Sequence, residues 1–196
     1  MTTIAIINNK GGAGKTAATQ YLGWCMAEDG MHVTLIDADG QANLTQNLGV
    51  DTRNDSSPRL PDALDGSVVH RYGLPHWPAG LSLIGSDHRL DDTASEMNIR
   101  PIRMTRLASL IGQEFDPMEI VIIDTPPNIG TLVYAALMAA DYVIIPAQPV
   151  GESIAGARRM FPLLGEIHNE MGRAPKPLGI IAAHVQHQNI AHQPGM

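Results

Sequence analysis

Aromatic residues and cysteine are scarce in this sequence. Aromatics make up only 4% of the 196 residues, although 44% are hydrophobic. We therefore expect a core built from Ile, Leu, Val, Ala and Met, as is usual where helices pack on a parallel sheet. Cys25 is the only cysteine and cannot form an internal disulfide. Because it lies in an apolar helical pattern, we predict a buried structural thiol.

Long apolar runs and an excess of basic residues are also absent. No stretch approaches the roughly 18 uninterrupted apolar residues of a membrane span. The N-terminus enters the apolar run Thr3–Ile7 with neither a basic flank nor a small-residue cleavage site, which predicts a cytoplasmic chain. The formal net charge of −7 argues against a strongly cationic surface. Contact with nucleic acid would therefore need a local basic patch or several subunits together.

Short β-branched runs alternate with stretches of helical period. The predicted strands are Thr3–Ile7, His32–Ile36, Leu81–Ile84, Glu119–Ile123, Tyr142–Ile145 and Leu178–Ile181. The predicted helices are Thr16–Glu28, Ile102–Phe115, Ile129–Ala139 and Glu152–Glu170. This alternation predicts an α/β fold, a doubly wound and mostly parallel sheet with helices on both faces, with ligands at the carboxyl ends of the strands.

The chain length favours one domain, predicted over residues 1–182 and followed by a short polar tail at 183–196. Residues 51–80 differ from the rest of this domain because they hold four prolines and many polar residues. We predict an irregular surface connection there, with a brief helical turn at Leu60–Leu64.

A glycine-rich loop follows the first predicted strand and leads directly into the first predicted helix. It reads Asn9-Lys10-Gly11-Gly12-Ala13-Gly14-Lys15-Thr16, in the strand, loop, helix context that a phosphate-binding P-loop requires. Glycines let backbone N–H groups surround phosphate oxygens, Lys15 adds positive charge at the β and γ phosphates, and Thr16 offers a hydroxyl to Mg²⁺. The predicted nucleotide-binding residues are Lys10, Gly11, Gly12, Ala13, Gly14, Lys15, Thr16 and Ala17.

Lys10 is an addition to the usual P-loop pattern. That pattern begins with glycine six residues before the lysine, where this chain has Asn9. If Lys10 contacted the nucleotide bound by its own loop, its charge would be redundant with that of Lys15. We therefore interpret Lys10 as a residue that reaches the nucleotide of a facing subunit.

Two more predicted strands end in aspartates. Asp37-Ala38-Asp39-Gly40-Gln41-Ala42-Asn43 follows the second, and Asp124-Thr125-Pro126-Pro127-Asn128 follows the fourth. Carboxylates at such strand ends can hold magnesium, directly or through water, or orient an attacking water. We predict Lys10, Lys15 and Asp39 as catalytic residues. The predicted residues around the metal are Thr16, Asp39 and Asp124.

Together, Lys10–Thr16, Asp37–Asn43 and Asp124–Pro127 resemble the motifs of the ParA branch of the ParA/MinD ATPases, P-loop proteins with a second, signature lysine. The resemblance runs from residue 1 to about Ile181. It implies a slow ATPase that binds ATP or ADP with Mg²⁺ and forms a sandwich homodimer when ATP is bound. In that dimer Lys10 contacts the opposite nucleotide and Gly12 lies at the interface, while Asp39 supports hydrolysis.

The resemblance also implies partners and a location. In the family the ATP-bound dimer coats DNA without sequence preference, and a cargo-bound, ParB-like protein stimulates hydrolysis and releases it. The result is segregation of plasmid or chromosomal DNA or positioning of another cargo, at the nucleoid in the cytoplasm. Arg158, Arg159, Arg173 and Lys176 are candidates for DNA contact, although a solvated helix face explains them equally well.

Two features depart from the family pattern. Gly40 stands where the family usually has proline. The family also commonly continues past the strand matching Leu178–Ala182, with elements that close the base pocket, whereas this sequence ends at Met196. Two interpretations are consistent with this difference: a compact variant of the family, or a truncated nucleotide-binding module without turnover. A missing part would leave a sheet edge or apolar helix faces uncovered.

The sequence argues against two other functions and against a zinc site. A MinD-like membrane-cycling ATPase should finish in a basic amphipathic helix, which residues 187–196 do not form, so we expect no membrane partner. Iron–sulfur reductases with the same signature lysine need cluster-ligating cysteines, which Cys25 alone cannot supply. The histidines His184, His187 and His192 match no zinc-site spacing.

Overall fold

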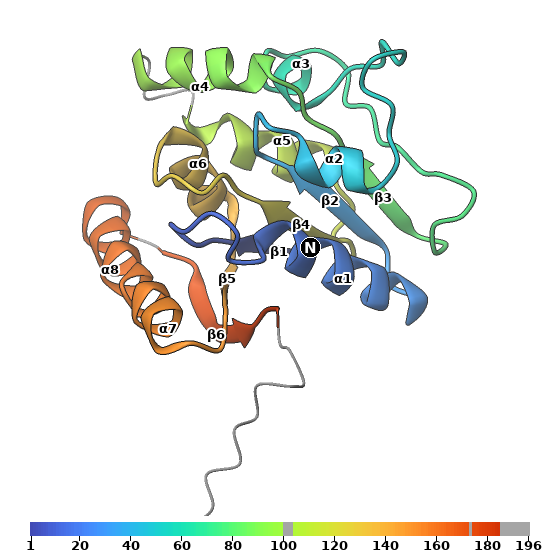
Figure 1. Cartoon of the computed structure of the whole chain (residues 1–196). Coiled ribbons are helices and arrows are strands. Elements are labelled where there is room, and N and C mark those ends of the chain that lie inside the picture. Colours follow the sequence, from blue (N-terminus) through green and yellow to red (C-terminus); the bar gives the residue numbers. More distant parts are fainter. Residues whose placement is uncertain (100–103, 173, 185–196) are drawn as a thin grey trace, which may run out of the picture.

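The computed structural model describes residues 1–99, 104–172 and 174–184 (Figure 1). At its centre is a six-stranded sheet with the strand order β3-β2-β4-β1-β5-β6. All neighbouring strands in it are parallel. The strands are β1 (Thr2–Ile6), β2 (Val33–Asp37), β3 (Leu81–Ile84), β4 (Ile120–Asp124), β5 (Tyr142–Ala147) and β6 (Lys176–Ala182). The predicted parallel α/β sheet is confirmed, and each predicted strand overlaps one of these.

Helices cover both faces of the sheet. They are α1 (Lys15–Glu28), α2 (Asn43–Asn47), α3 (Leu60–Leu64), α4 (Arg89–Ile99), α5 (Arg106–Glu114), α6 (Thr131–Ala139), α7 (Gly151–Arg158) and α8 (Met160–Met171). In β1, Ile4 and Ile6 point into one core cluster with residues of α1 and α2. Ala5, on the opposite face, lies in a second cluster with residues of α3 to α8. Successive strand residues point to opposite faces, so the inner strands β1, β2, β4 and β5 are buried on both sides.

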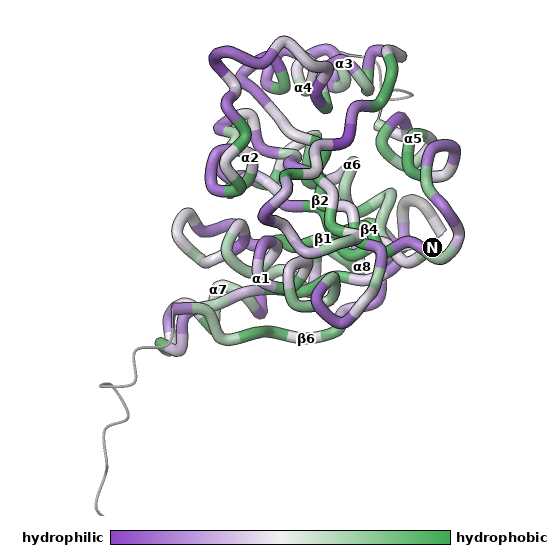
Figure 2. Tube along the Cα trace, turned by 90° about the vertical axis from the view of Figure 1, so that its right-hand side faces the viewer, coloured by the Kyte–Doolittle hydropathy of each residue, from purple (hydrophilic) through white to green (hydrophobic). Residues whose placement is uncertain are grey.

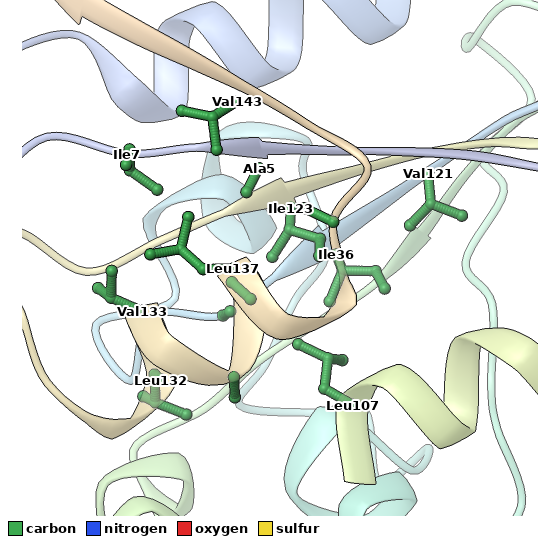
Figure 3. Close-up of a cluster of buried hydrophobic side chains, with 14 of the residues drawn as sticks. Ala5, Ile7, Ile36, Leu107, Val121, Ile123, Leu132, Val133, Leu137 and Val143 are labelled. Carbon is green, nitrogen blue, oxygen red and sulfur yellow. The ribbon is translucent and has the colours of Figure 1, made fainter. Parts of the chain in front are cut away.

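The larger cluster joins strand and helix side chains from distant parts of the sequence (Figure 3). Ala5, Ile123 and Val143 reach it from three strands, and Val133 and Leu137 face them from α6. Aliphatic residues of this kind supply most of the core, as the low aromatic content predicts.

Three expectations need correction or refinement. α4 was not predicted, because its sequence is mostly polar, although Leu90, Ala94 and Met97 follow the helical spacing and pack in the core. The helical stretch predicted at Glu152–Glu170 is divided at Arg159 into α7 and α8.

The prediction for Cys25 is wrong. Its side chain is exposed, because α1 faces the sheet with Thr19, Gly23 and Ala27 instead.

The segment 51–80 is irregular apart from α3, as predicted, but it is firmly attached. Tyr72 forms an isolated antiparallel bridge with Leu83 of β3, and Tyr72 and Trp77 are both buried. At the other side of the sheet, β6 is an outer strand with Leu178 57% exposed and Ile181 38% exposed. Figure 2 shows hydrophobic colouring along β6 at this edge. In the described parts of the chain, no helix is both long and apolar enough to cross a membrane.

Candidate nucleotide site

The glycine-rich loop lies between the end of β1 and the start of α1 (Figure 1). Gly12 and Gly14 have φ angles of 70° and 90°. This is a left-handed backbone conformation that residues other than glycine rarely adopt. Asn8 fixes the start of the loop, because its Nδ2 donates to the carbonyl of Pro146 at 2.7 Å. Its Oδ1 accepts the backbone N–H of Lys10 at 3.0 Å. The loop therefore presents the N-terminus of a 14-residue helix, where the helix dipole and free N–H groups favour an anion.

Lys15 and Asp124 lie close together beneath this loop. Lys15 is 7% exposed and Asp124 is 1% exposed. Burial lowers the pKa of Lys15, and the charges of Asp124 and Asp39 act in the opposite direction. Burial, with the neighbouring charge of Asp37, raises the pKa of Asp124 to about 8, although a hydrogen bond from the Thr16 hydroxyl and the charge of Lys15 oppose the rise. Without a ligand, the site thus holds a carboxyl group that is costly to ionise.

The residues present fit a magnesium ion. Asp124 Oδ1 is buried and has no hydrogen-bond partner among the described residues, so one carboxylate oxygen is left for a ligand beside Thr16. No group of three or more potential His, Cys, Asp or Glu ligands occurs in the described part of the chain. Magnesium, unlike zinc, commonly takes one or two protein ligands and completes its shell with waters and substrate phosphates.

Asp37 has a structural role that the sequence did not reveal. It pairs in register with Asp124 on the neighbouring strand. One of its oxygens accepts the Thr45 N–H at 2.9 Å and the Thr45 hydroxyl at 2.6 Å, and the other accepts the Asp39 N–H at 3.2 Å. Burial raises its pKa to about 6, against the effect of these hydrogen bonds. Asp37 therefore anchors the chain turn that carries Asp39.

An open pocket of about 420 Å³ collects the predicted residues. Its lining comprises Gly11, Gly12, Ala13, Gly14, Lys15, Thr16, Ala17, Asp39, Gln41, Asn43, Asn47, Thr125, Pro127 and His184. Of the predicted site residues, Lys10 and Asp124 do not line it. Lys10 is exposed at the start of the loop, and Asp124 lies underneath at the end of β4.

His184 was predicted as part of a polar tail but contributes to this pocket. It follows β6 and has a φ of 55°, which is uncommon for a residue other than glycine. Its ring lies 3.5 Å from the position that a Cβ on Gly14 would take. No local sequence signal identifies this contact, because it depends on how β6 ends beside the loop. His187 and His192 lie outside the described residues.

The basic residues considered for DNA contact do not line the pocket. Arg158 and Arg159 are exposed at the end of α7 and at the residue after it. Lys176 is exposed at the first residue of β6, at the edge of the sheet opposite to the carboxyl ends that form the pocket. Arg173 lies outside the described residues.

Comparison with known proteins places this site in context. A protein-family model described as AAA domain matches residues 1–175. A ParA family protein of Chlamydia pneumoniae is 37% identical over 171 residues, covering 82% of this chain and 64% of that protein. The sporulation initiation inhibitor protein Soj of Bacillus subtilis is 37% identical over 153 residues, covering 74% of this chain and 57% of Soj. The chain thus spans 57% to 64% of the length of these two relatives.

The fold is also similar to a solved structure with nucleotide bound. Cobyrinic acid a,c-diamide synthase from Mycobacterium smegmatis, solved with ADP and magnesium, gives a TM-score of 0.86 at 26% identity. The similarity covers 96% of this chain and 77% of that one. The same protein has been solved with an ATP analogue and magnesium.

Proposed function

Because this chain belongs to the ParA-type P-loop ATPases, we propose that it is a slow partition or positioning ATPase that cycles between nucleotide states. ATP with Mg²⁺ drives formation of a sandwich homodimer, and hydrolysis to ADP and phosphate separates the subunits. The dimer binds DNA without sequence preference, and a cargo-bound, ParB-like protein stimulates its hydrolysis. The cycle takes place in the cytoplasm at the nucleoid.

One observation carries this proposal. The fold brings Lys15, Thr16 and Asp124 together at the N-terminus of α1, with one oxygen of Asp124 unpartnered. Phosphoryl transfer depends on positioning and on charge stabilisation rather than on covalent chemistry by the protein. A buried lysine beside a carboxylate and a hydroxyl at the start of a helix suits both needs.

Each residue has a distinct role in the proposed reaction. Backbone N–H groups of the loop hold the phosphates, and Lys15 balances their negative charge. Thr16 and Asp124 would hold Mg²⁺, which when bound neutralises charge on the phosphate oxygens. Asp39, on the pocket wall, orients the attacking water and supports the metal site. Lys10, exposed beside its own loop, reaches across to the nucleotide of the facing subunit.

A second candidate is a nucleotide-binding module without turnover. The observation that favours it is the exposed apolar outer strand β6, with Leu178 and Ile181 uncovered. Such a module would bind nucleotide through the same loop but would remain a monomer. A membrane-cycling function has no comparable support among the described residues.

Solution mass with ATP and Mg²⁺, with ADP, and without nucleotide separates the two candidates. A dimer found only with ATP, and accumulating in the Asp39→Ala variant, is the expected result. A monomer under all three conditions would favour the module without turnover.

Point variants test the roles of the site residues. We expect Lys15→Ala to abolish nucleotide binding, since Lys15 is the buried charge at the phosphates. Lys10→Ala and Asp39→Ala should leave nucleotide binding intact and impair dimer formation or hydrolysis. Unchanged turnover in both of these variants would refute the mechanism. DNA binding by the ATP-bound form is then measured with duplexes of unrelated sequence, at stated salt concentrations.

A further inference from the structure

Two loops at the pocket end against the same helix, α4. We call residues 37–43 the Asp39 loop and residues 124–130 the Asp124 loop. The Asp39 loop follows β2, and the Asp124 loop leads from β4 to α6. α4 lies at the edge of the molecule beside α3, beyond the carboxyl ends of the strands (Figure 1).

The first turn of α4 contacts the Asp39 loop at Gly40. A Cβ built on Gly40 would lie 2.5 Å from Asp91 Oδ1 and 2.8 Å from Asp91 Cγ, closer than real side chains approach. Gly40 is buried, and it is not among the glycines with positive φ. Its backbone conformation would accept another residue, but a side chain there would have to displace the end of the exposed Asp91 side chain, which rests against Gly40.

The other end of α4 contacts the residue after the Asp124 loop. Thr131, the first residue of α6, donates a hydrogen bond from its hydroxyl to Asn98 Oδ1. Thr131 is 7% exposed, whereas Asn98 is exposed, so this bond is only partly shielded from water.

α4 itself is held firmly between these two contacts. Leu90 and Met97 are at most 1% exposed and pack in the larger core cluster. At its first residue, Arg89 donates to both oxygens of Asp62, at 2.7 Å and 2.8 Å. A helix fixed to the core in this way can transmit the position of one loop to the other as a rigid element.

We propose that Asp91 is a positioning residue for Asp39, and that α4 links the Asp39 loop to the Asp124 loop. The Asp91 carboxylate acts by occupying the space at Gly40 and thereby holding the neighbouring Asp39 in place over the phosphates. Asn98 and Thr131 tie the other end of α4 to the loop that follows the metal-binding carboxylate. This inference rests on the proposed function, since it assigns Asp39 a role in hydrolysis.

Exchange of the groups at positions 40 and 91 tests the proposal. Asp91→Ala should lower kcat for ATP hydrolysis by roughly fivefold, in the range of coupling between contacting residues. Gly40→Ala should keep kcat within about twofold of the original, because the new methyl group fills the space that the displaced carboxylate leaves. In the double variant Gly40→Ala with Asp91→Ala, the methyl group takes the vacated space, so kcat should return to within about twofold of the original. The affinity for ATP should change little in all three, since the glycine-rich loop is untouched.

Two further variants serve as controls. Asp92→Ala removes an exposed carboxylate on the same turn, about 100° around the helix, and should leave kcat unchanged. Asp91→Asn keeps the volume of the side chain and should retain most of the activity. Equal losses in Asp91→Asn and Asp91→Ala would overturn the space-filling role.

Failure of this inference can be told apart from failure of the proposed function. If Asp39→Ala leaves hydrolysis unchanged, the assigned role of Asp39 is wrong. If Asp39→Ala lowers hydrolysis while the effects of Gly40→Ala and Asp91→Ala simply add, or neither has an effect, only the positioning role of Asp91 is refuted.

Discussion

At the residue scale, the most unusual group is Asp124. Its carboxyl group faces Lys15, Thr16, Asp37 and Asp39, and its pKa is raised from 3.8 to about 8. The folded protein therefore keeps a proton on this group between about pH 4 and about pH 8, where the unfolded chain has lost it. A group with a raised carboxyl pKa stabilises the folded state at low pH and ceases to do so as the pH rises through this window.

Stability should accordingly fall with rising pH in the protein without metal or nucleotide. Denaturant unfolding in EDTA, measured at intervals from about pH 5 to about pH 8, is expected to show a decreasing free energy of unfolding. Asp124→Asn, which cannot ionise, should remove much of this slope, whereas Asn in place of the exposed Asp92 should leave it. A slope equal in Asp124→Asn and the original chain would show that the raised pKa of Asp124 is not its source.

At the element scale, Arg59 attaches the irregular segment 51–80 to the rest of the fold. Arg59 is 7% exposed. Its Nη1 donates to Asp87 Oδ2 at 3.0 Å, and its Nη2 donates to the carbonyl of Thr52 at 3.2 Å. The Arg59 guanidinium thus links the residues before α3 to the turn that precedes α4.

Removal of this side chain should be costly. We expect Arg59→Ala to lower the free energy of unfolding by about 3 kcal/mol, as is usual when one partner of a buried ion pair is lost. Arg89, whose side chain is 45% exposed, also pairs with Asp87, and Arg89→Ala should cost only about 1 kcal/mol because exposed pairs contribute little. Chemical denaturation of both variants measures the difference. Equal losses would mean that burial does not distinguish the two arginines.

At the scale of the whole molecule, the pocket is assembled from strand ends that are distant in sequence. β1, β2 and β4 are neighbours in the sheet, and they bring the glycine-rich loop, Asp39 and the Asp124 loop to one edge. The end of β6 adds His184. A ligand in this pocket contacts several parts of the sheet at once, and it binds only when all of them are folded.

ATP with Mg²⁺ should therefore stabilise the entire domain. At a ligand concentration 100 times the Kd, the gain is about 2.7 kcal/mol, which thermal unfolding detects as a higher Tm. Lys15→Ala should lose this shift, whereas Lys176→Ala, exposed at the opposite edge of the sheet, should retain it. A shift that persists in Lys15→Ala would place the nucleotide elsewhere.

Much of the fold and of the site can be predicted from local sequence. The inner strands β1, β2, β4 and β5 follow from short apolar, β-branched runs, since a strand buried on both faces needs mostly apolar residues. α4 was missed because only Leu90, Ala94 and Met97 mark its buried side. The burial of Cys25 was wrongly predicted because an apolar helical pattern does not show which face of the helix meets the sheet.

The sequence alone determined the order of the strands along the chain, the glycine-rich loop with Lys10 and Lys15, and the two aspartate motifs, because each is specified by neighbouring residues. The tertiary structure decided the burial that raises the pKa of Asp124, the anchoring of Asp37 by Thr45, and the approach of Asp91 to Gly40. These features depend on side chains that meet only when distant segments pack together, and no local pattern encodes such a meeting.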